Sequence, residues 1–237
     1  MAIEPILAMT AAEIRNQDAV PSRIAWMACH FSPYGSGLSN LPTVLPAGSL
    51  LVVDDSTPLH SHDKALILEQ LAECTQTLDA AAVLLDFQRP DNPETAVLVN
   101  YLSDALPCPL AVSDCYAHYG DAPVFLAPVP LSTPLSAYLA PWKGRNIWLD
   151  LSCAGEILYL TENGCRSSAL DSRERPENGF SDRNLHCHYQ ITESENSLRF
   201  TLWRTAEDVY TLLEEAEALG VTVAVGLYQE LHANSPK

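Results

Sequence analysis

The chain has 237 residues, of which 47% are hydrophobic and 18% charged, a composition typical of a globular protein with a sizeable core. Its 30 Asp and Glu residues outnumber 13 Lys and Arg residues, which gives a formal net charge of −17. A surface this acidic repels nucleic-acid backbones and anionic lipid headgroups, so we expect neither nucleic acid nor a membrane as a partner.

The distribution of cysteines and the N-terminal sequence bear on the cellular compartment in which the protein is expected. The seven cysteines are scattered and include no C-x-x-C pair, which favours a reducing environment over a disulfide framework. The N-terminal segment lacks a basic region, and Glu13 and Arg15 interrupt its apolar stretch, unlike a secretory signal. No apolar run reaches the length that spans a bilayer. We therefore expect a cytoplasmic protein.

The first quarter of the chain predicts two strands separated by a loop. Residues 1–22 form an N-terminal lead-in, with a short helix expected around Thr10–Gln17. The first strand is predicted at 23–31. The segment 32–49 is rich in proline and glycine, which is typical of a long loop rather than a crossover helix. The second strand is predicted at 50–55.

Helical spacing is clearest in three segments. After Ser61, a candidate N-cap, apolar residues recur at helical spacing from Ile67 to Leu78. The Asn-Pro-Glu sequence at 92–94 is typical of a helix start. A third helix is predicted to begin after Thr205 and to end at Gly220.

Short and nearly continuous apolar runs alternate with these helices, as expected of strands buried on both faces. The runs are residues 81–88, 109–114, 123–128, 146–151 and 221–227. This rhythm predicts an α/β fold, a small (β/α)8 TIM-type barrel, in a single domain at 23–231. A doubly wound open sheet is the alternative, although Gly35-Ser36-Gly37 lacks the third glycine of a phosphate-binding fingerprint.

The alternation of strands and helices is interrupted at about 155–200, where we expect a β-hairpin-rich insertion late in the chain. Two polar turns divide this segment into hairpins. Their strands are predicted at 156–161, 165–166, 188–192 and 198–204. The polar stretch 167–184 is predicted to be an exposed loop, and residues 232–237 a C-terminal tail.

Four apolar runs end in an aspartate, at Asp54 (followed by Asp55), Asp86, Asp114 and Asp150. Because parallel barrel strands end at one rim, we expect these carboxylates to line one pocket together with Glu230. Clustered carboxylates raise one another's pKa, which is how a general acid stays protonated near neutral pH. The candidate catalytic residues are Asp86, Asp54, Asp114 and Glu230. The alternative role for each aspartate is to cap a following helix.

Candidate ligand-binding residues lie beside these acids. They are Gln88, Asp55, Tyr116, Trp148, Asp150, Tyr228 and Trp26. Flat rings next to hydrogen-bonding groups are typical of a surface that binds a sugar ring, although Trp26 and Trp148 fit the barrel core equally well.

Other chemistries have weaker support in the sequence. The pairs His60-Ser61-His62 and His186-Cys187-His188 have metal-ligand spacing, but neither has a supporting ligand downstream, so we expect no metal and no cofactor. Cys29 and His30 are adjacent on a predicted strand, where their side chains point to opposite faces.

The run LDAAAVLLDFQRP at 78–90, the helix that ends YLSDAL at 101–106 and the run LAVS at 110–113 resemble one region of a known family. They resemble the catalytic-strand region of family-18 glycoside hydrolases, the chitinase-like β/α barrels. Residues 205–230 also resemble that family's last helix and strand, so that the resemblance covers about a quarter of the chain.

The family's strand motif, D-G-x-D-x-D-x-E, is mostly lost. Its first Asp, its Gly and its second Asp fall on Ala81, Ala82 and Leu84, whereas Asp86 is kept. The proton-donating Glu falls on Gln88, whose carboxamide has no titratable proton. The resemblance therefore implies a site that binds without cleaving or that uses other carboxylates.

Three functions are consistent with these observations. We expect a catalytically degenerate, glycoside-hydrolase-like TIM barrel that binds a carbohydrate-like or polar small molecule. The alternative is an active glycoside hydrolase that uses other strand-end carboxylates. In a third hypothesis the barrel is an inherited scaffold, and the 155–200 insertion is the working surface of an assembly component.

Overall fold

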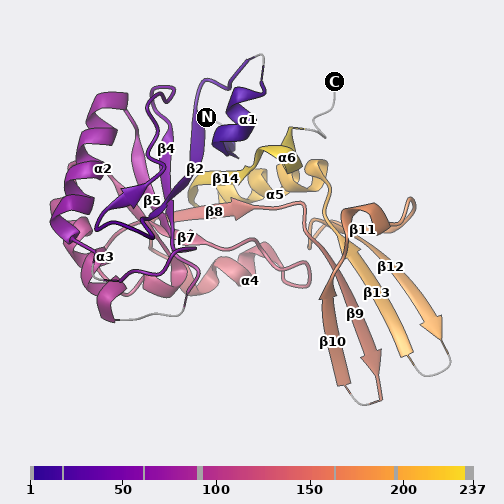
Figure 1. The fold of residues 1–237 in the computed structure, drawn as a ribbon. Coiled ribbons are helices and arrows are strands. Elements are labelled where there is room, and N and C mark those ends of the chain that lie inside the picture. The colour runs from indigo at the N-terminus through magenta and orange to yellow at the C-terminus, as the bar shows by residue number, and fades with distance from the viewer. Residues whose placement is uncertain are drawn as a thin grey trace.

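The computed structural model describes residues 3–17, 19–60, 62–89, 93–162, 164–194 and 197–232. Eight parallel strands form a closed barrel (Figure 1). They are β1 (Ile6–Met9), β2 (Ile24–Phe31), β4 (Leu50–Asp54), β5 (Ala82–Asp86), β6 (Leu110–Ser113), β7 (Val124–Leu126), β8 (Ile147–Leu151) and β14 (Val221–Leu227). Because β1 pairs with both β14 and β2, the sheet closes on itself. The predicted (β/α)8 barrel is confirmed and the open-sheet alternative is wrong.

The barrel begins earlier than the sequence predicted. Ile6–Met9, placed in the N-terminal lead-in, form strand β1 instead. Four residues are too few to show a periodicity, and it is the burial of Ile6 and Ala8 inside the closed sheet that stabilises the strand. The short helix α1 (Ala11–Arg15) follows, with a capping box between Thr10 and Glu13.

Helices and short 3-10 turns follow most of the barrel strands, and the last of these turns lies in the later insertion. The helices are α2 (Lys64–Leu78), α3 (Pro93–Ala105), α4 (Leu135–Leu139), α5 (Ala206–Ala218) and α6 (Tyr228–Leu231), with 3-10 turns η1 (Asp114–Tyr116), η2 (Ala140–Trp142) and η3 (Ser172–Glu174). The loop at 32–49 contains only the two-residue strand β3 (Leu38–Ser39), which pairs with β2. No helix in the described part of the chain is long and apolar enough to cross a membrane.

The helix caps were only partly predictable. Asp63 caps α2, because its carboxylate accepts hydrogen bonds from the backbone N–H groups of Ala65 and Leu66. The predicted cap Ser61 and the predicted start Asn92 both lie outside the described residues. Helix α5 begins directly after Thr205, as predicted, and the Thr205 side chain caps it.

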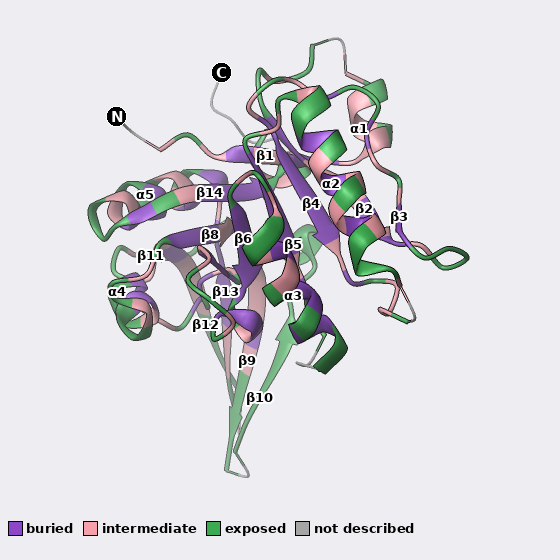
Figure 2. Cartoon of the chain, turned by 90° about the vertical axis from the view of Figure 1, so that its left-hand side faces the viewer, coloured by how far each residue is buried: buried purple, intermediate pink, exposed green. Residues whose placement is uncertain are grey.

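Most residues of the barrel strands are buried (Figure 2). Their side chains alternate between an inner and an outer hydrophobic layer. The inner core consists of Ile6, Ala8, Ala25, Leu50, Val52, Ala82, Leu84, Ala111, Phe125, Trp148 and Val225. A second, larger layer packs between the strands and α2, α3 and α5. The alternation therefore fixes which residue at each strand end faces the barrel axis.

The residues between β8 and α5 in the sequence form an antiparallel sheet that projects from the barrel (Figure 1). We call it the insertion sheet. Its strands are β9 (Gly155–Thr161), β10 (Gly164–Ala169), β11 (Phe180–Asp182), β12 (Cys187–Ser194) and β13 (Ser197–Trp203), in the order β10-β9-β13-β12-β11. The predicted hairpins are confirmed. The predicted 167–184 loop is partly wrong, because β10 continues to Ala169 and Phe180–Asp182 pair with β12.

Candidate functional site

Three of the strand-end carboxylates lie at the barrel mouth. Asp54 continues the inward-facing series Leu50 and Val52, and Asp86 is its direct neighbour in the pairing of β4 with β5. On β8, Asp150 follows the inward-facing Trp148 by two residues. Asp54, Asp86 and Asp150 therefore sit above the inner core at the carboxyl ends of their strands.

A cavity of about 150 Å³ opens at this mouth. Asp86, Asp150 and Ser152 line it, together with an apolar wall of Met27, Val52, Leu84, Phe125, Pro128 and Leu227. No Lys, Arg or His is found among the described residues that line it. The space equals about five water molecules, which suits one small ring or a substituent rather than an oligosaccharide.

Asp150 has the most perturbed carboxyl group of this site. Burial raises its pKa to about 7, and the negative charges of Asp86 and Glu230 act in the same direction. At neutral pH the group is therefore divided between its protonated and ionised forms. It can donate a hydrogen bond or a proton to a ligand in the cavity.

Asp86 lies among other acids and next to Gln88. Burial raises its pKa, the charges of Asp54 and Asp55 add to this effect, and a hydrogen bond from Gln88 opposes it. Gln88 Nε2 donates to Asp86 Oδ1 at 2.6 Å. The carboxamide therefore orients the retained aspartate and is itself exposed to solvent.

Asp55 supports the site from outside the cavity. Its buried carboxylate accepts hydrogen bonds from the backbone N–H groups of Gln88 (3.0 Å) and Arg89 (2.9 Å). Arg89 in turn donates to the carbonyl oxygens of Asp55 and Ser56, both at 2.7 Å. The predicted ligand-binding residue Asp55 thus fixes the loop that carries Gln88.

The remaining acids do not line the cavity. Glu230 on α6 accepts hydrogen bonds from the backbone N–H of Cys153 (2.6 Å) and the hydroxyl of Ser152 (3.1 Å), and its negative charge raises the pKa of Asp150. Asp114 is exposed at the start of η1, because the inward-facing position at the end of β6 is occupied by Ser113.

The aromatic candidates also lie away from the cavity. Trp148 belongs to the inner core beneath Asp150, and Tyr116 is buried between strands and helices, edge-on to Phe87. The Trp26 indole donates to the carbonyl oxygen of Asn40 on the outer face of β2. Tyr228 donates to Gln17 Oε1 at 2.8 Å. The mouth is therefore lined by aliphatic side chains and Phe125 rather than by a set of tryptophans and tyrosines.

Sequence reasoning missed the apolar wall and Tyr138. Counting back by two from Asp86 identifies Leu84, but the loop residue Pro128 has no comparable signal. Tyr138 on α4 lies near the mouth: burial and the charges of Asp114 and Asp150 raise its pKa to about 12, and its hydroxyl donates to the carbonyl of Ala127.

The two His-x-His pairs are engaged in other contacts. His62 Nε2 lies 3.0 Å from the carbonyl oxygen of Ser32. His186 Nε2 lies 2.7 Å from Glu215 Oε2, and His188 Nε2 lies 3.4 Å from Asp208 Oδ2, both on α5. No group of three or more potential ligands that could hold a metal ion occurs among the described residues.

Solved structures with the same fold are chitinases and related enzymes. A family GH18 chitinase from Cycas revoluta, in a complex with allosamidin, matches 98% of this chain and 97% of its own, with a TM-score of 0.62 and 11% identity. The chitinase from Chromobacterium violaceum matches 99% and 100%, with a TM-score of 0.57 and 8% identity. The Bacillus cereus spore cortex-lytic enzyme SleL matches 94% of this chain and 70% of its own, with a TM-score of 0.60 and 11% identity.

At these identities the likeness is one of fold. The chain has the fold of the chitinase-like β/α barrels, as its resemblance to family 18 predicted. Neither a protein-family model nor a curated protein matches the sequence.

Proposed function

We propose that the barrel mouth binds a carbohydrate-like or polar small molecule without hydrolysing it. The observation that carries the proposal is the pair Asp86 and Asp150 facing one cavity at the carboxyl ends of parallel strands, where barrel proteins place their sites. A protonated Asp150 donates a hydrogen bond to a ligand oxygen, and an ionised Asp86 accepts one from a hydroxyl. The aliphatic wall packs against the apolar face of one ring.

Gln88 is the reason for proposing binding over cleavage. The family motif places a glutamic acid at this position, and a carboxamide cannot donate a proton to a leaving group. The Cycas revoluta relatives were solved with (GlcNAc)4 and with allosamidin, which supports a sugar as the ligand class. The expected cytoplasmic location and the lack of nucleic-acid and membrane partners stay predictions.

Calorimetric titration with N-acetylglucosamine, which has a single sugar ring, beside a turnover assay on chromogenic glycosides, tests this proposal. We expect saturable binding, no turnover, and at least tenfold weaker binding in Asp86→Asn and Asp150→Leu, because both substitutions remove a charge-assisted or acid hydrogen bond. Asp114→Asn is the matched control, since Asp114 is exposed outside the cavity. The proposal fails if Asp86→Asn binds as tightly as the wild type.

An active hydrolase is the second candidate, and one observation favours it. Asp150, with its pKa raised to about 7, meets the requirement for a general acid at neutral pH, and Asp86 faces the same cavity. This candidate predicts wild-type turnover that falls as the pH rises above about 7, because Asp150 then loses its proton. It also predicts that Asp150→Asn abolishes turnover.

A further inference from the structure

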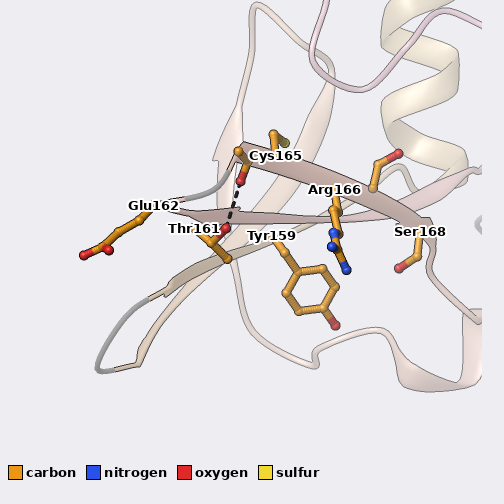
Figure 3. A pocket seen from close by; sticks show the side chains of 8 residues that line it. Tyr159, Thr161, Glu162, Cys165, Arg166 and Ser168 are labelled. Atoms are coloured by element: carbon orange, nitrogen blue, oxygen red, sulfur yellow. Dashed lines mark hydrogen bonds between the residues drawn. The ribbon is translucent and has the colours of Figure 1, made fainter.

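A row of three side chains crosses one face of the insertion sheet. Arg166 on β10, Tyr159 on β9 and Arg199 on β13 are direct neighbours in the strand pairing, so their side chains lie on the same face. Figure 3 shows Tyr159, Arg166 and Ser168 on one side of the ribbon and Cys165 on the other. The guanidinium carbon of Arg199 lies 5.9 Å from the centre of the Tyr159 ring. We call these three residues the Arg-Tyr-Arg row.

An open hollow of about 790 Å³ adjoins this row. Tyr159, Thr161, Arg166 and Ser168 line it from the face that carries the row, with Glu162 and Gly164 at its turn end. Cys165 and Ser167 border it from the opposite face, and Arg199 lies next to it across the ring of Tyr159. Its volume lies within the range of roughly 300–1,000 Å³ that is typical of small-molecule sites, unlike the barrel mouth. The hollow therefore has room for a sugar ring together with its substituents.

The two arginines of the row have no partner for their hydrogen-bond donors. Among the described residues, neither side chain makes a hydrogen bond or an ion pair, and Arg199 Nε is buried without an acceptor. Other arginines of the same segment are engaged: Arg173 pairs with Asp171, and Arg204 donates to backbone carbonyl oxygens. Because only Nε of Arg199 is buried, the terminal nitrogens of its guanidinium group stay open to solvent and can donate to an anion.

Charge is distributed unevenly along the chain. Residues 155–204 contain six arginines against eight Asp and Glu, whereas the rest of the chain contains seven Lys and Arg against 22 Asp and Glu. Unpaired guanidinium groups therefore occur where the general repulsion of anions is weakest. Protection of an exposed sheet edge accounts for Arg166 on the edge strand β10 but not for Arg199, because β13 lies at the centre of the sheet.

We propose that the Arg-Tyr-Arg row binds an acidic saccharide. Tyr159, which is 37% exposed, presents its ring to the face of a sugar, and the guanidinium forks of Arg166 and Arg199 hold a carboxylate. Sulfate and phosphate share this recognition chemistry. The site is distinct from the barrel mouth, where the carboxylates of Asp86 and Asp150 repel the same group.

Titration of the full chain with tetragalacturonate tests the proposal, because its methyl ester has the same rings without the charges. We expect saturable binding of the acid at about 1 mM or below, weakened at least tenfold by esterification. The double variant R166Q/R199Q is expected to lose this preference, and Tyr159→Ala to weaken both ligands. Arg173→Gln, which removes a paired arginine of the same segment, is expected to bind as the wild type does.

The variants separate this site from the barrel mouth. Asp86→Asn and Asp150→Leu, which test the mouth, are expected to leave tetragalacturonate binding unchanged. Binding of a sulfated tetrasaccharide alone, sensitive to R166Q/R199Q, identifies sulfate as the anion and supports the row. The proposal is overturned if no acidic saccharide binds saturably, or if R166Q/R199Q binds tetragalacturonate as tightly as the wild type.

Discussion

Charged side chains are partly buried at the barrel mouth and exposed on the edge of the insertion sheet. At the mouth, acids are drawn into an apolar cavity, and burial raises the pKa values of Asp86 and Asp150. On the insertion sheet, β10 is exposed along its whole length, and its arginine keeps contact with solvent (Figure 2). Burial in the barrel therefore raises the pKa of a carboxyl group, whereas hydrogen bonds from Arg173 lower the pKa of the exposed Asp171 in the insertion.

Arg204 joins the two regions, so its removal has the largest expected effect. Its buried guanidinium donates to the carbonyl oxygens of Val129, in a barrel loop, and of Leu185 and His186, in the insertion (2.9, 3.1 and 2.9 Å). In Arg204→Met all three acceptors lose their donor. We expect the free energy of unfolding in urea to fall by on the order of 4 kcal/mol.

The matched control for this variant is Arg173→Met, which removes an exposed arginine of the same segment. We expect it to leave the free energy of unfolding close to that of the wild type. Equal effects of the two variants would show that the insertion sheet is held to the barrel without Arg204.

The second prediction concerns the pH dependence that burial gives to the mouth. The pKa of Asp150 is about 7 in the folded protein, against an ordinary value of about 4 in the unfolded chain. Between these values the folded state retains a proton that the unfolded state has lost, so stability falls as the pH rises from about 4 to 7. Asp150→Asn removes this titration. At pH 8 we expect it to be more stable than the wild type by on the order of 3 kcal/mol, measured by urea unfolding.

The insertion sheet provides the control for this titration. Glu162 is an exposed carboxylate at the turn between β9 and β10, and Glu162→Gln is expected to have the same free energy of unfolding at pH 8 as the wild type. If Asp150→Asn and the wild type have parallel profiles between pH 4 and 8, burial does not perturb the Asp150 carboxyl group.

The burial of the barrel strands also explains which parts of the structure could be predicted from the sequence. The barrel was predictable because strands buried on both faces appear as continuous apolar runs, and Asp54, Asp86 and Asp150 fall at inward-facing ends of such runs. Asp114 breaks the pattern, because β6 ends one residue earlier, at Ser113. Strand β1 was missed because four residues carry no periodicity, although its pairing closes the barrel.

Side-chain roles were harder to predict than side-chain positions along the strands. Asp55 is adjacent to Asp54 in sequence but points away from the cavity and binds the loop that carries Gln88. Glu230 binds a backbone N–H from a segment 77 residues away, a contact that no local pattern indicates. The Arg-Tyr-Arg row depends on the register of three strands, which is a tertiary property.

The smallest expected effect is at the cap between the insertion sheet and α5. Thr205 Oγ1 accepts from the Asp208 N–H, and Asp208 Oδ2 accepts from the Thr205 N–H at 2.7 Å. Asp208 Oδ2 also lies 3.4 Å from His188 on β12, so the cap and the insertion sheet share one carboxylate. We expect Thr205→Ala to lower the free energy of unfolding by about 1 kcal/mol and to speed amide hydrogen exchange in β12.

The matched control is Thr10→Ala, which removes the same kind of capping box from α1, remote from the insertion. We expect it to leave amide exchange in β12 unchanged. Faster exchange in both variants would mean that β12 responds to global stability rather than to the shared carboxylate of Asp208.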